Sequence, residues 1–378
     1  MSLKISIVGT RGIPANYGGF ETYAEEISKS LVEIGHDVCV FNPHTRKVKE
    51  NKIYGVSVKY IFDIEPMMPG RILKAISTII YDALSLIRAS LSQTDIIILC
   101  GYASGPFMII PRIFGKKLIV NPDGFEWNSA RWGKLAKRWL LFCEKLSSII
   151  PNHLVADSDA IKEHFLKKYN CEATTITYGA PLVRFAERSK LTEKKKDYYL
   201  IIARMVPETS IPMMIEGYIL SQSKKFLYVV GPIKDKLFFD NEINPLIQKY
   251  SNVIFLGPVY SEGDVQKIRY NSFALLHGHA SEGTNPSLIE SMATGSIILA
   301  IKRQSNIIPL TERHNVFFDS QNDLSAKIKW LENLTFQERS KIKEDNFENA
   351  KTRFSWPMKA AEHEKVILKV LKKELYEY

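Results

Sequence analysis

Two glutamates stand eight positions apart in one polar segment of the chain. The segment, residues 273–295, reads as a strand, a loop and a helix that begins near Pro286, because proline is favoured at a first helical position. Glu282 falls in the loop and Glu290 one turn into the helix, so both should face one ligand. Since a carboxylate accepts hydrogen bonds from vicinal hydroxyls, one glutamate suits a ribose and the other a hexose.

The start of this predicted helix also suits a phosphate. The first amides of a helix have no partner within it, and here they belong to Ser287 and Leu288. The alternative is an ordinary capped helix in which the two glutamates occur by chance.

The motif Glu-Gly-Thr-Asn-Pro-Ser-Leu-Ile-Glu over residues 282–290 resembles the paired-glutamate motif of glycosyltransferase family 4. The resemblance implies a GT-B fold, with Glu290 on the nucleotide ribose, Glu282 at the reacting donor sugar and helix amides on the diphosphate. It also implies a diphosphate contact for Arg204, whose guanidinium suits two phosphate oxygens. A surface ion pair with Glu208 is the alternative for Arg204. The implied donor-binding residues are Arg204, His277, Glu282, Gly283, Thr284, Asn285, Ser287, Leu288 and Glu290.

Four segments in order look like a narrower group, the bacterial rhamnosyltransferase branch of capsule and rhamnan synthesis. They are residues 9–22, 123–127, 206–208 and 277–279. The resemblance implies a retaining enzyme that moves rhamnose from dTDP-rhamnose to a lipid-linked saccharide, and a UDP- or GDP-linked donor is the alternative. The chain departs from the branch at Glu282, where glycine is common, at Asn128, where a basic run is usual, and at Thr209, where asparagine is usual. Many family members have a lysine at the position of Thr209.

A glycine-rich segment, residues 9–19, joins the first predicted strand to a helix. Gly18 and Gly19 let the backbone approach a ligand at the helix start. In GT-B enzymes the corresponding loop lies over the diphosphate and the acceptor, so we expect Gly18, Gly19, Phe20 and Glu21 there. A purely structural turn is the alternative, and Glu21 is either a partner of the helix dipole or an acceptor contact.

Asp123 follows a short apolar run and is the candidate proton acceptor, or a ligand of an acceptor hydroxyl. A turn-forming role before Gly124 is equally compatible with its position.

The sequence gives no support for a metal or another cofactor. His277 and His279 lie one residue apart, but no third ligand cluster accompanies them. Asp157 and Asp159 imitate the D-x-D of another glycosyltransferase fold, yet a helix start with Ser158 as the cap explains them better. The four cysteines have no short spacing, which favours neither disulfides nor zinc.

Residues 131–142 are basic and aromatic, and the whole chain has a formal net charge of +10. A helix there would suit an anionic lipid surface, with Trp132 and Trp139 at the interface. A helix that packs its aromatic side into the core is the alternative. Single-stranded nucleic acid is disfavoured, because no recognised nucleic-acid module is present. With no apolar run long enough to span a bilayer and no signal peptide, we expect a cytoplasmic, peripheral membrane protein.

These residues require an α/β scaffold with two doubly wound, Rossmann-like halves and a ligand cleft between them. We predict an acceptor-side domain at 1–186, a nucleotide-sugar domain at 187–356 and a last helix, about 357–378, that packs back on the first domain. The charged stretch 187–197 reads as the linker. The predicted strands are 5–9, 38–41, 95–99, 118–120 and 154–156, then 198–203, 226–230, 253–256, 273–276, 297–301 and 316–318. A nucleotide-sugar epimerase of the same fold and a non-catalytic sugar- or lipid-binding protein are the rival functions.

Overall fold

The computed structural model describes residues 2–15, 19–46, 49–65, 70–122, 124–128, 132–184, 197–259, 261–279, 285–310 and 317–372. It has two compact units, Met1–Tyr178 with Trp356–Tyr378, and Gly179–Ser355. The first unit therefore ends before residue 186, where the sequence placed the boundary. The reason lies in two backbone bonds inside the second unit: the Ala180 amide donates to Phe354 and the Val183 amide to Ala293.

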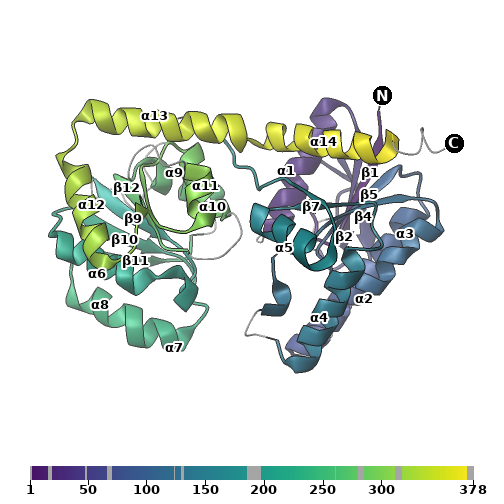
Figure 1. Cartoon of the computed structure of the whole chain (residues 1–378), viewed down its shortest axis with the longest axis horizontal. Helices are drawn as coiled ribbons and strands as arrows, with labels where there is room; N and C mark the ends of the chain where they lie inside the picture. Colours follow the sequence, from purple (N-terminus) through teal and green to yellow (C-terminus); the bar gives the residue numbers. More distant parts are fainter. Residues whose placement is uncertain are drawn as a thin grey trace. The chain divides into compact units, whose positions relative to one another are not determined.

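The first unit is built on an eight-stranded sheet of order β3-β4-β2-β1-β5-β6-β7-β8 (Figure 1). Its strands are β1 (Lys4–Val8), β2 (Asp37–Pro43), β3 (Lys52–Ile53), β4 (Val56–Ile61), β5 (Ile96–Cys100), β6 (Lys117–Asn121), β7 (His153–Ala156) and β8 (Ala173–Thr175). All pairs are parallel except β3 with β4.

Successive residues of its central strands enter two different cores, as the period of a strand requires. Ile5, Ile7, Ile96 and Ile98 belong to one core, and Val8, Ile97 and Leu99 to the other. Both faces of the sheet are thus covered, which explains why these strands read as continuous apolar runs.

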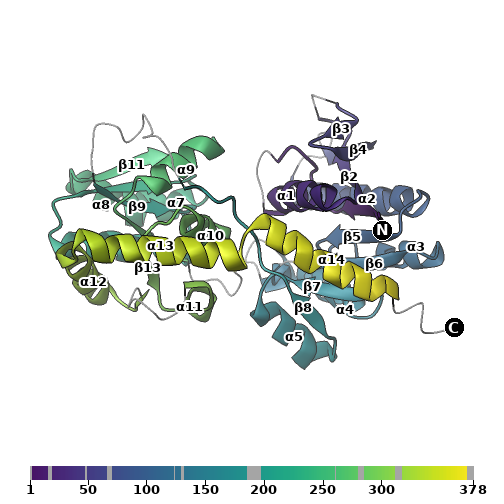
Figure 2. The same cartoon turned by 90° about the horizontal axis from the view of Figure 1, so that it is seen from above.

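The helices of the first unit are α1 (Gly19–Ile34), α2 (Arg71–Ser90), η2 (Gly105–Met108), α3 (Ile109–Ile113), η3 (Glu126–Asn128), α4 (Lys134–Ser147), α5 (Asp159–Tyr169) and the C-terminal α14 (Trp356–Lys372). Although 178 positions separate Tyr178 from Trp356, α14 packs beside α1 (Figures 1 and 2). As expected from the sequence, Ser158 caps α5 by accepting from the Ile161 amide, with Asp159 in the first turn.

The second unit has a six-stranded parallel sheet of order β11-β10-β9-β12-β13-β14. Its strands are β9 (Tyr198–Ile202), β10 (Phe226–Val230), β11 (Val253–Gly257), β12 (Ala274–His277), β13 (Ile298–Ile301) and β14 (Phe317–Phe318). Numbered within the unit this is 3-2-1-4-5-6, the order of a doubly wound nucleotide-binding sheet.

Its helices are η4 (Pro207–Thr209), α6 (Ile211–Ser221), α7 (Lys236–Phe238), η5 (Phe239–Ile243), α8 (Asn244–Lys249), α9 (Glu262–Tyr270), α10 (Pro286–Ala293), α11 (Gln304–Leu310), α12 (Gln321–Asn333) and α13 (Phe336–Arg353). α6 packs against α12, and α10 against α13. Within the described ranges, no helix combines the length and the apolar character that a bilayer span requires.

Candidate functional site

Arg204 and His277 lie where the strand order of the second sheet reverses. β9 and β12 are neighbours there, and each residue sits at or just beyond the carboxyl end of its strand. From β9 the chain winds to β10 and β11 on one side, then returns to β12 on the other. Open parallel sheets bind ligands outside the carboxyl ends of their strands at such a point.

The loops after these two strands touch. A Cβ on Gly278 would lie 2.4 Å from the Thr209 carbonyl oxygen, so only glycine fits. Thr209 is buried, and its hydroxyl donates to the carbonyls of Val206, at 2.7 Å, and Arg204, at 3.2 Å. Thr209 therefore closes the loop from inside. The Arg204 side chain is exposed, and the alternative ion pair with Glu208 is not formed.

His277 is buried at the end of β12, and its Nε2 has no hydrogen-bond partner among the described residues. Burial, then the charges of His279 and Arg269, lowers the pKa of His277 to about 3. Burial and the nearby Arg204 also lower the pKa of His279, against the opposing effect of Glu208. Both rings are therefore neutral at pH 7, and their centroids lie 6.5 Å apart.

The amino end of α10 differs from the sequence prediction in one respect. Asn285 is its N-cap and accepts from the Ser287 amide at 2.9 Å, while the Leu288 amide donates to the Asn285 carbonyl at 3.0 Å. The prediction that these two amides are free was therefore wrong for this state of the loop. An asparagine cap competes with a phosphate for the same donor.

Glu290 is held by a residue that sequence reasoning missed. Arg269, in α9, is buried, with 3% of its side chain exposed, and its Nη2 lies 2.6 Å from Glu290 Oε2. The same nitrogen donates to Ser287 Oγ at 3.0 Å. The Glu290 side chain keeps 27% of its surface exposed. The pair thus fixes one carboxylate oxygen while the group remains open to a ligand.

Five predicted site residues lie outside the described residues: Gly18, Asp123, Glu282, Gly283 and Thr284. Their roles stay predictions.

In the first unit, the segment after β1 is clamped by side chains. Arg46 donates to the carbonyls of Arg11, Gly12 and Pro14, and the Asn42 amide group bonds both backbone groups of Ile13. A Cβ on Gly12 would lie 1.9 Å from Asn42 Oδ1, so glycine is required there.

Glu21 takes part in this clamp, because its Oε1 accepts from the Arg11 amide at 2.9 Å. Gly19 begins α1, and a Cβ there would meet the Tyr178 hydroxyl at 3.2 Å. Phe20 packs against the core of the first unit. The three described residues of the predicted acceptor loop thus have structural contacts of their own.

The described part of the predicted acceptor motif is anchored by a buried carboxylate. Trp127 donates its indole N–H to Glu144 Oε2, and His164, Lys168 and Tyr169 bond Glu144 Oε1 at 3.0, 2.9 and 2.7 Å. Burial alone would raise the pKa of Glu144, but these hydrogen bonds hold it below its usual value. The loop that follows Asp123 is therefore tied to α4 and α5.

The basic aromatic helix begins at Lys134, three residues later than predicted, and divides its side chains between the two readings. Leu140 and Cys143 enter the core, whereas Leu135 is 81% and Phe142 49% exposed. Trp139 is 37% exposed, and Trp132 packs against the core.

Within the described ranges, no three His, Cys, Asp or Glu side chains gather so as to hold a metal ion. Metal-independent chemistry stays a prediction.

Residues 2–181 match a family described as a domain of unknown function, DUF1972. No curated protein matches the sequence of the chain.

Solved structures are similar over nearly the whole chain. Sucrose-phosphate synthase from Thermosynechococcus elongatus has a TM-score of 0.77 at 16% identity, covering 98% of this chain and 100% of that one. The catalytic domain of starch synthase IV from Arabidopsis thaliana, bound to ADP and acarbose, has 0.77 at 13%, with 98% and 100% covered. Anabaena HepE in complex with UDP and glucose has 0.69 at 15%, with 97% and 100% covered. The architecture that the chain shares with these proteins is the GT-B fold, as the sequence predicted.

Proposed function

We propose that the chain is a glycosyltransferase that moves a sugar from a nucleotide diphosphate to an acceptor hydroxyl, with retention at the anomeric carbon. The observation that carries the proposal is the Arg269–Glu290 pair at the strand-order reversal of a 3-2-1-4-5-6 sheet. A positioned carboxylate there suits the two vicinal hydroxyls of a ribose. The GT-B fold, shared with proteins titled as glycosyltransferases and synthases, supports it.

The proposed chemistry is electrostatic. The bond between the sugar and the diphosphate breaks, and Arg204 stabilises the negative charge on the departing nucleoside diphosphate. The acceptor hydroxyl bonds to the same sugar carbon and loses its proton, for which Asp123 is the proposed acceptor. Glu282 is assigned to the donor sugar. Asn285 would turn away from Ser287 when the diphosphate takes that amide.

A donor screen by thermal shift and by transfer assay tests the proposal. We expect one nucleotide sugar to stabilise the protein and Glu290→Ala to abolish that shift, while Glu242→Ala, an exposed glutamate of the same unit, keeps it. If no nucleotide sugar binds, the function is wrong. If Glu290→Ala still transfers sugar normally, the assignment of Glu290 is wrong.

We further propose dTDP-rhamnose as the donor, on the sequence resemblance of residues 9–22 and 277–279. The rival is a UDP-linked sugar, which HepE and an E. coli trehalose-6-phosphate protein hold in structures titled as UDP-glucose and UDP-2-fluoro glucose complexes. Preference of the screen for UDP-glucose over dTDP-rhamnose would settle the donor in favour of the rival.

A membrane surface fits the proposed lipid-linked acceptor. α2, α3 and α4 expose Ile72 (71%), Ile113 (70%) and Leu135 (81%). Their two acidic residues, Asp82 and Glu144, are both buried. Their exposed charged side chains are all basic: Lys74, Arg88, Arg112, Lys134, Arg138 and Lys145. Apolar side chains rimmed by cations suit an anionic lipid surface.

Vesicle co-sedimentation tests this surface. We expect binding to vesicles with anionic lipid, little binding to zwitterionic vesicles, and loss at high salt. Leu135→Ser should weaken binding, whereas Leu237→Ser, which is 73% exposed in the second unit, should not. Equal binding to both kinds of vesicle, or none to either, contradicts the proposal.

A further inference from the structure

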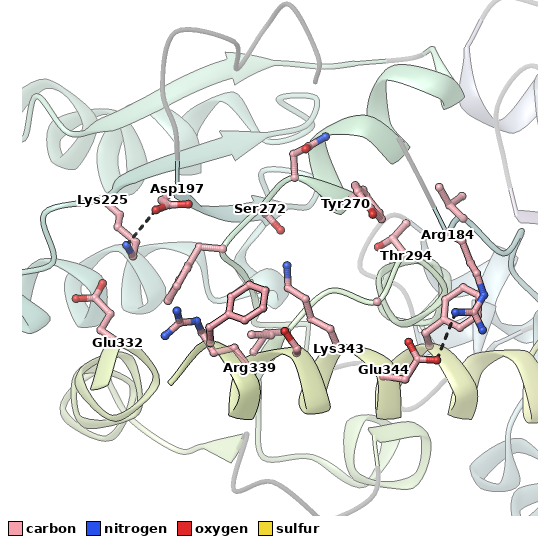
Figure 3. Close-up of a pocket in the computed structure, with 18 residues that line it drawn as sticks. Arg184, Asp197, Lys225, Tyr270, Ser272, Thr294, Glu332, Arg339, Lys343 and Glu344 are labelled. Atoms are coloured by element: carbon pink, nitrogen blue, oxygen red, sulfur yellow. Dashed lines mark hydrogen bonds and ion pairs between the residues drawn. The ribbon is translucent and has the colours of Figure 1, made fainter. Parts of the chain in front are cut away.

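A second site lies at the opposite edge of the second sheet. A cavity of about 560 Å³ opens there, lined by residues that precede the strands rather than follow them. Asp197 precedes β9, Lys225 precedes β10, Phe273 precedes β12 and Ile297 stands just before β13. Because the sheet is parallel, this edge is opposite to the one that carries Arg204 and His277. Figure 3 shows the cavity with its lining residues.

Two cations flank one aromatic ring of the cavity wall. Lys225 Nζ lies 4.4 Å from the centroid of the Phe273 ring, and Arg339 Cζ lies 5.5 Å from it. A cation over an aromatic face is attracted to the ring without being neutralised. The ring therefore holds both positive groups near the cavity while they remain able to bind an anion.

Lys343 adds a third cation four residues after Arg339 on α13. Its side chain rises from the helix toward Ser272 and Thr294 (Figure 3). Like charges at this spacing repel one another on a helix. Burial and the Arg339 charge lower the pKa of Lys343, and among the described residues no carboxylate lies within ion-pair distance of its ammonium group. An anion would relieve this repulsion.

The acidic residues of the lining are engaged elsewhere. Glu332 accepts from Tyr199 at 3.1 Å and from Ser223 at 2.6 Å. Glu344 pairs with Arg184 at 3.3 Å. Asp197 is 70% exposed and stands 3.8 Å from Lys225. None of them neutralises Lys343, so the interior of the cavity stays positive.

The remaining lining is apolar or carries hydroxyl groups. Phe273 and Phe347 offer aromatic surface, and Ser340 lies on the same wall as the cations. A cavity of this volume suits a small molecule rather than a lone ion. We propose that it binds a phosphorylated small molecule, with the phosphate between Lys343, Arg339 and Lys225 and the organic part against Phe273 and Phe347. The proposal is independent of the transferase function.

Titration calorimetry with a hexose phosphate, with inorganic phosphate as the comparison, tests the site. Lys343→Met should weaken hexose-phosphate binding by about tenfold or more, since it removes a charge-assisted contact. Lys341→Met is the matched control on the same helix, because Lys341 is 73% exposed and pairs with Asp345. Arg204→Ala controls for binding at the opposite edge of the sheet. Lys343→Arg, which keeps the charge, should retain binding, and a melting curve checks that each variant folds.

Four outcomes would overturn the proposal. The first is no heat of binding up to about 10 mM ligand, beyond the weakest affinities of interest. The second is loss in Arg204→Ala with no loss in Lys343→Met, which would move the ligand to the other edge. The third is an equal loss in Lys341→Met, which would indicate unspecific charge attraction. The fourth is inorganic phosphate binding as tightly as the hexose phosphate, which would indicate a free ion.

Discussion

Arg269 and Glu290 form an ion pair whose two members are buried to different extents. The arginine side chain is 3% exposed and the glutamate 27%. Removing one partner leaves the other uncompensated, and the cost depends on how much water can reach what remains.

Glu290→Gln should therefore destabilise the second unit more than Arg269→Gln. We expect about 3 kcal/mol when the buried guanidinium loses its carboxylate, and about 1 kcal/mol when the partly exposed carboxylate loses its arginine. Melting temperatures check this, since 1 kcal/mol corresponds to roughly 2–4 °C for a unit of this size. The double variant should regain stability but not donor binding. Equal losses for the two single variants contradict the argument.

His363 supplies a second prediction at the same scale, in the first unit. Its Nδ1 lies 2.8 Å from the Lys359 carbonyl, which only accepts, so Nδ1 carries the proton and Nε2 accepts from the Tyr23 hydroxyl at 2.7 Å. Burial lowers the pKa of His363 to about 4.

The unfolded chain binds a proton at His363 more readily than the folded one, so stability should fall as the pH drops from 6.5 toward 4. The loss is up to about 3 kcal/mol. Asp82 acts in the opposite direction, because burial raises its pKa to about 7 and its contribution declines as the pH rises from 3.8 to 7. Melting temperature against pH, compared between the protein and His363→Gln, isolates the histidine. An unchanged acid slope in the variant would show that His363 stays unprotonated.

At this scale the sequence located the glutamate pair and Arg204 because their neighbours in the chain carry the pattern. Arg269 escaped because its partner, Glu290, lies on another helix and nothing near Arg269 in the sequence marks it. Glu144 escaped for the same reason, since Trp127 and Tyr169 reach it from either side in the chain.

Glu144 joins elements rather than single residues. It lies on α4, three of its partners lie on α5, and Trp127 brings in the segment that follows Asp123. The carboxylate is thus the common acceptor through which two helices and a loop keep their spacing.

Glu144→Ala should cost about 3–5 kcal/mol, because it leaves several buried donors without an acceptor. Glu144→Gln should cost less and loosen the loop, seen as a change in Trp127 fluorescence. Glu163→Gln is the matched control, since Glu163 is 63% exposed on α5. If Glu144→Gln leaves both melting and fluorescence unchanged, the carboxylate does not anchor the loop.

Elements with a strong local pattern were predicted to within a few residues. α6 and α10 match the predicted 211–221 and 286–293, because apolar spacing and proline mark their starts. β3 and β8 were missed because they are short and only partly buried. The state of the α10 amides also escaped, since it depends on the rotamer of Asn285.

At the scale of the whole molecule, the chain leaves its first unit and returns to it. α14 supplies Ala360, Ile367 and Val370 to the same core as Ile5 and Ile27. The part that matches DUF1972 ends at residue 181 and lacks this helix. The sequence predicted a returning helix from its amphipathic pattern and the family resemblance, but pattern alone does not say which core it covers.

A fragment of residues 1–181 should therefore be poorly folded, with exposed apolar surface that binds a hydrophobic dye. Linking residues 356–372 to it should restore a cooperative melt, and the same fusion with Ile367→Asp should not. A fragment of residues 1–181 that melts as sharply as the fusion would show that the helix is dispensable for the core.

The return of α14 also sets a timetable for synthesis. The ribosome completes Tyr178 and must add 178 more residues to reach Trp356. At roughly 5–20 residues per second this takes about 10–35 s, during which the entire second unit emerges. The half of the protein made first is thus the half finished last, and until then its open core is a surface that chaperones can bind.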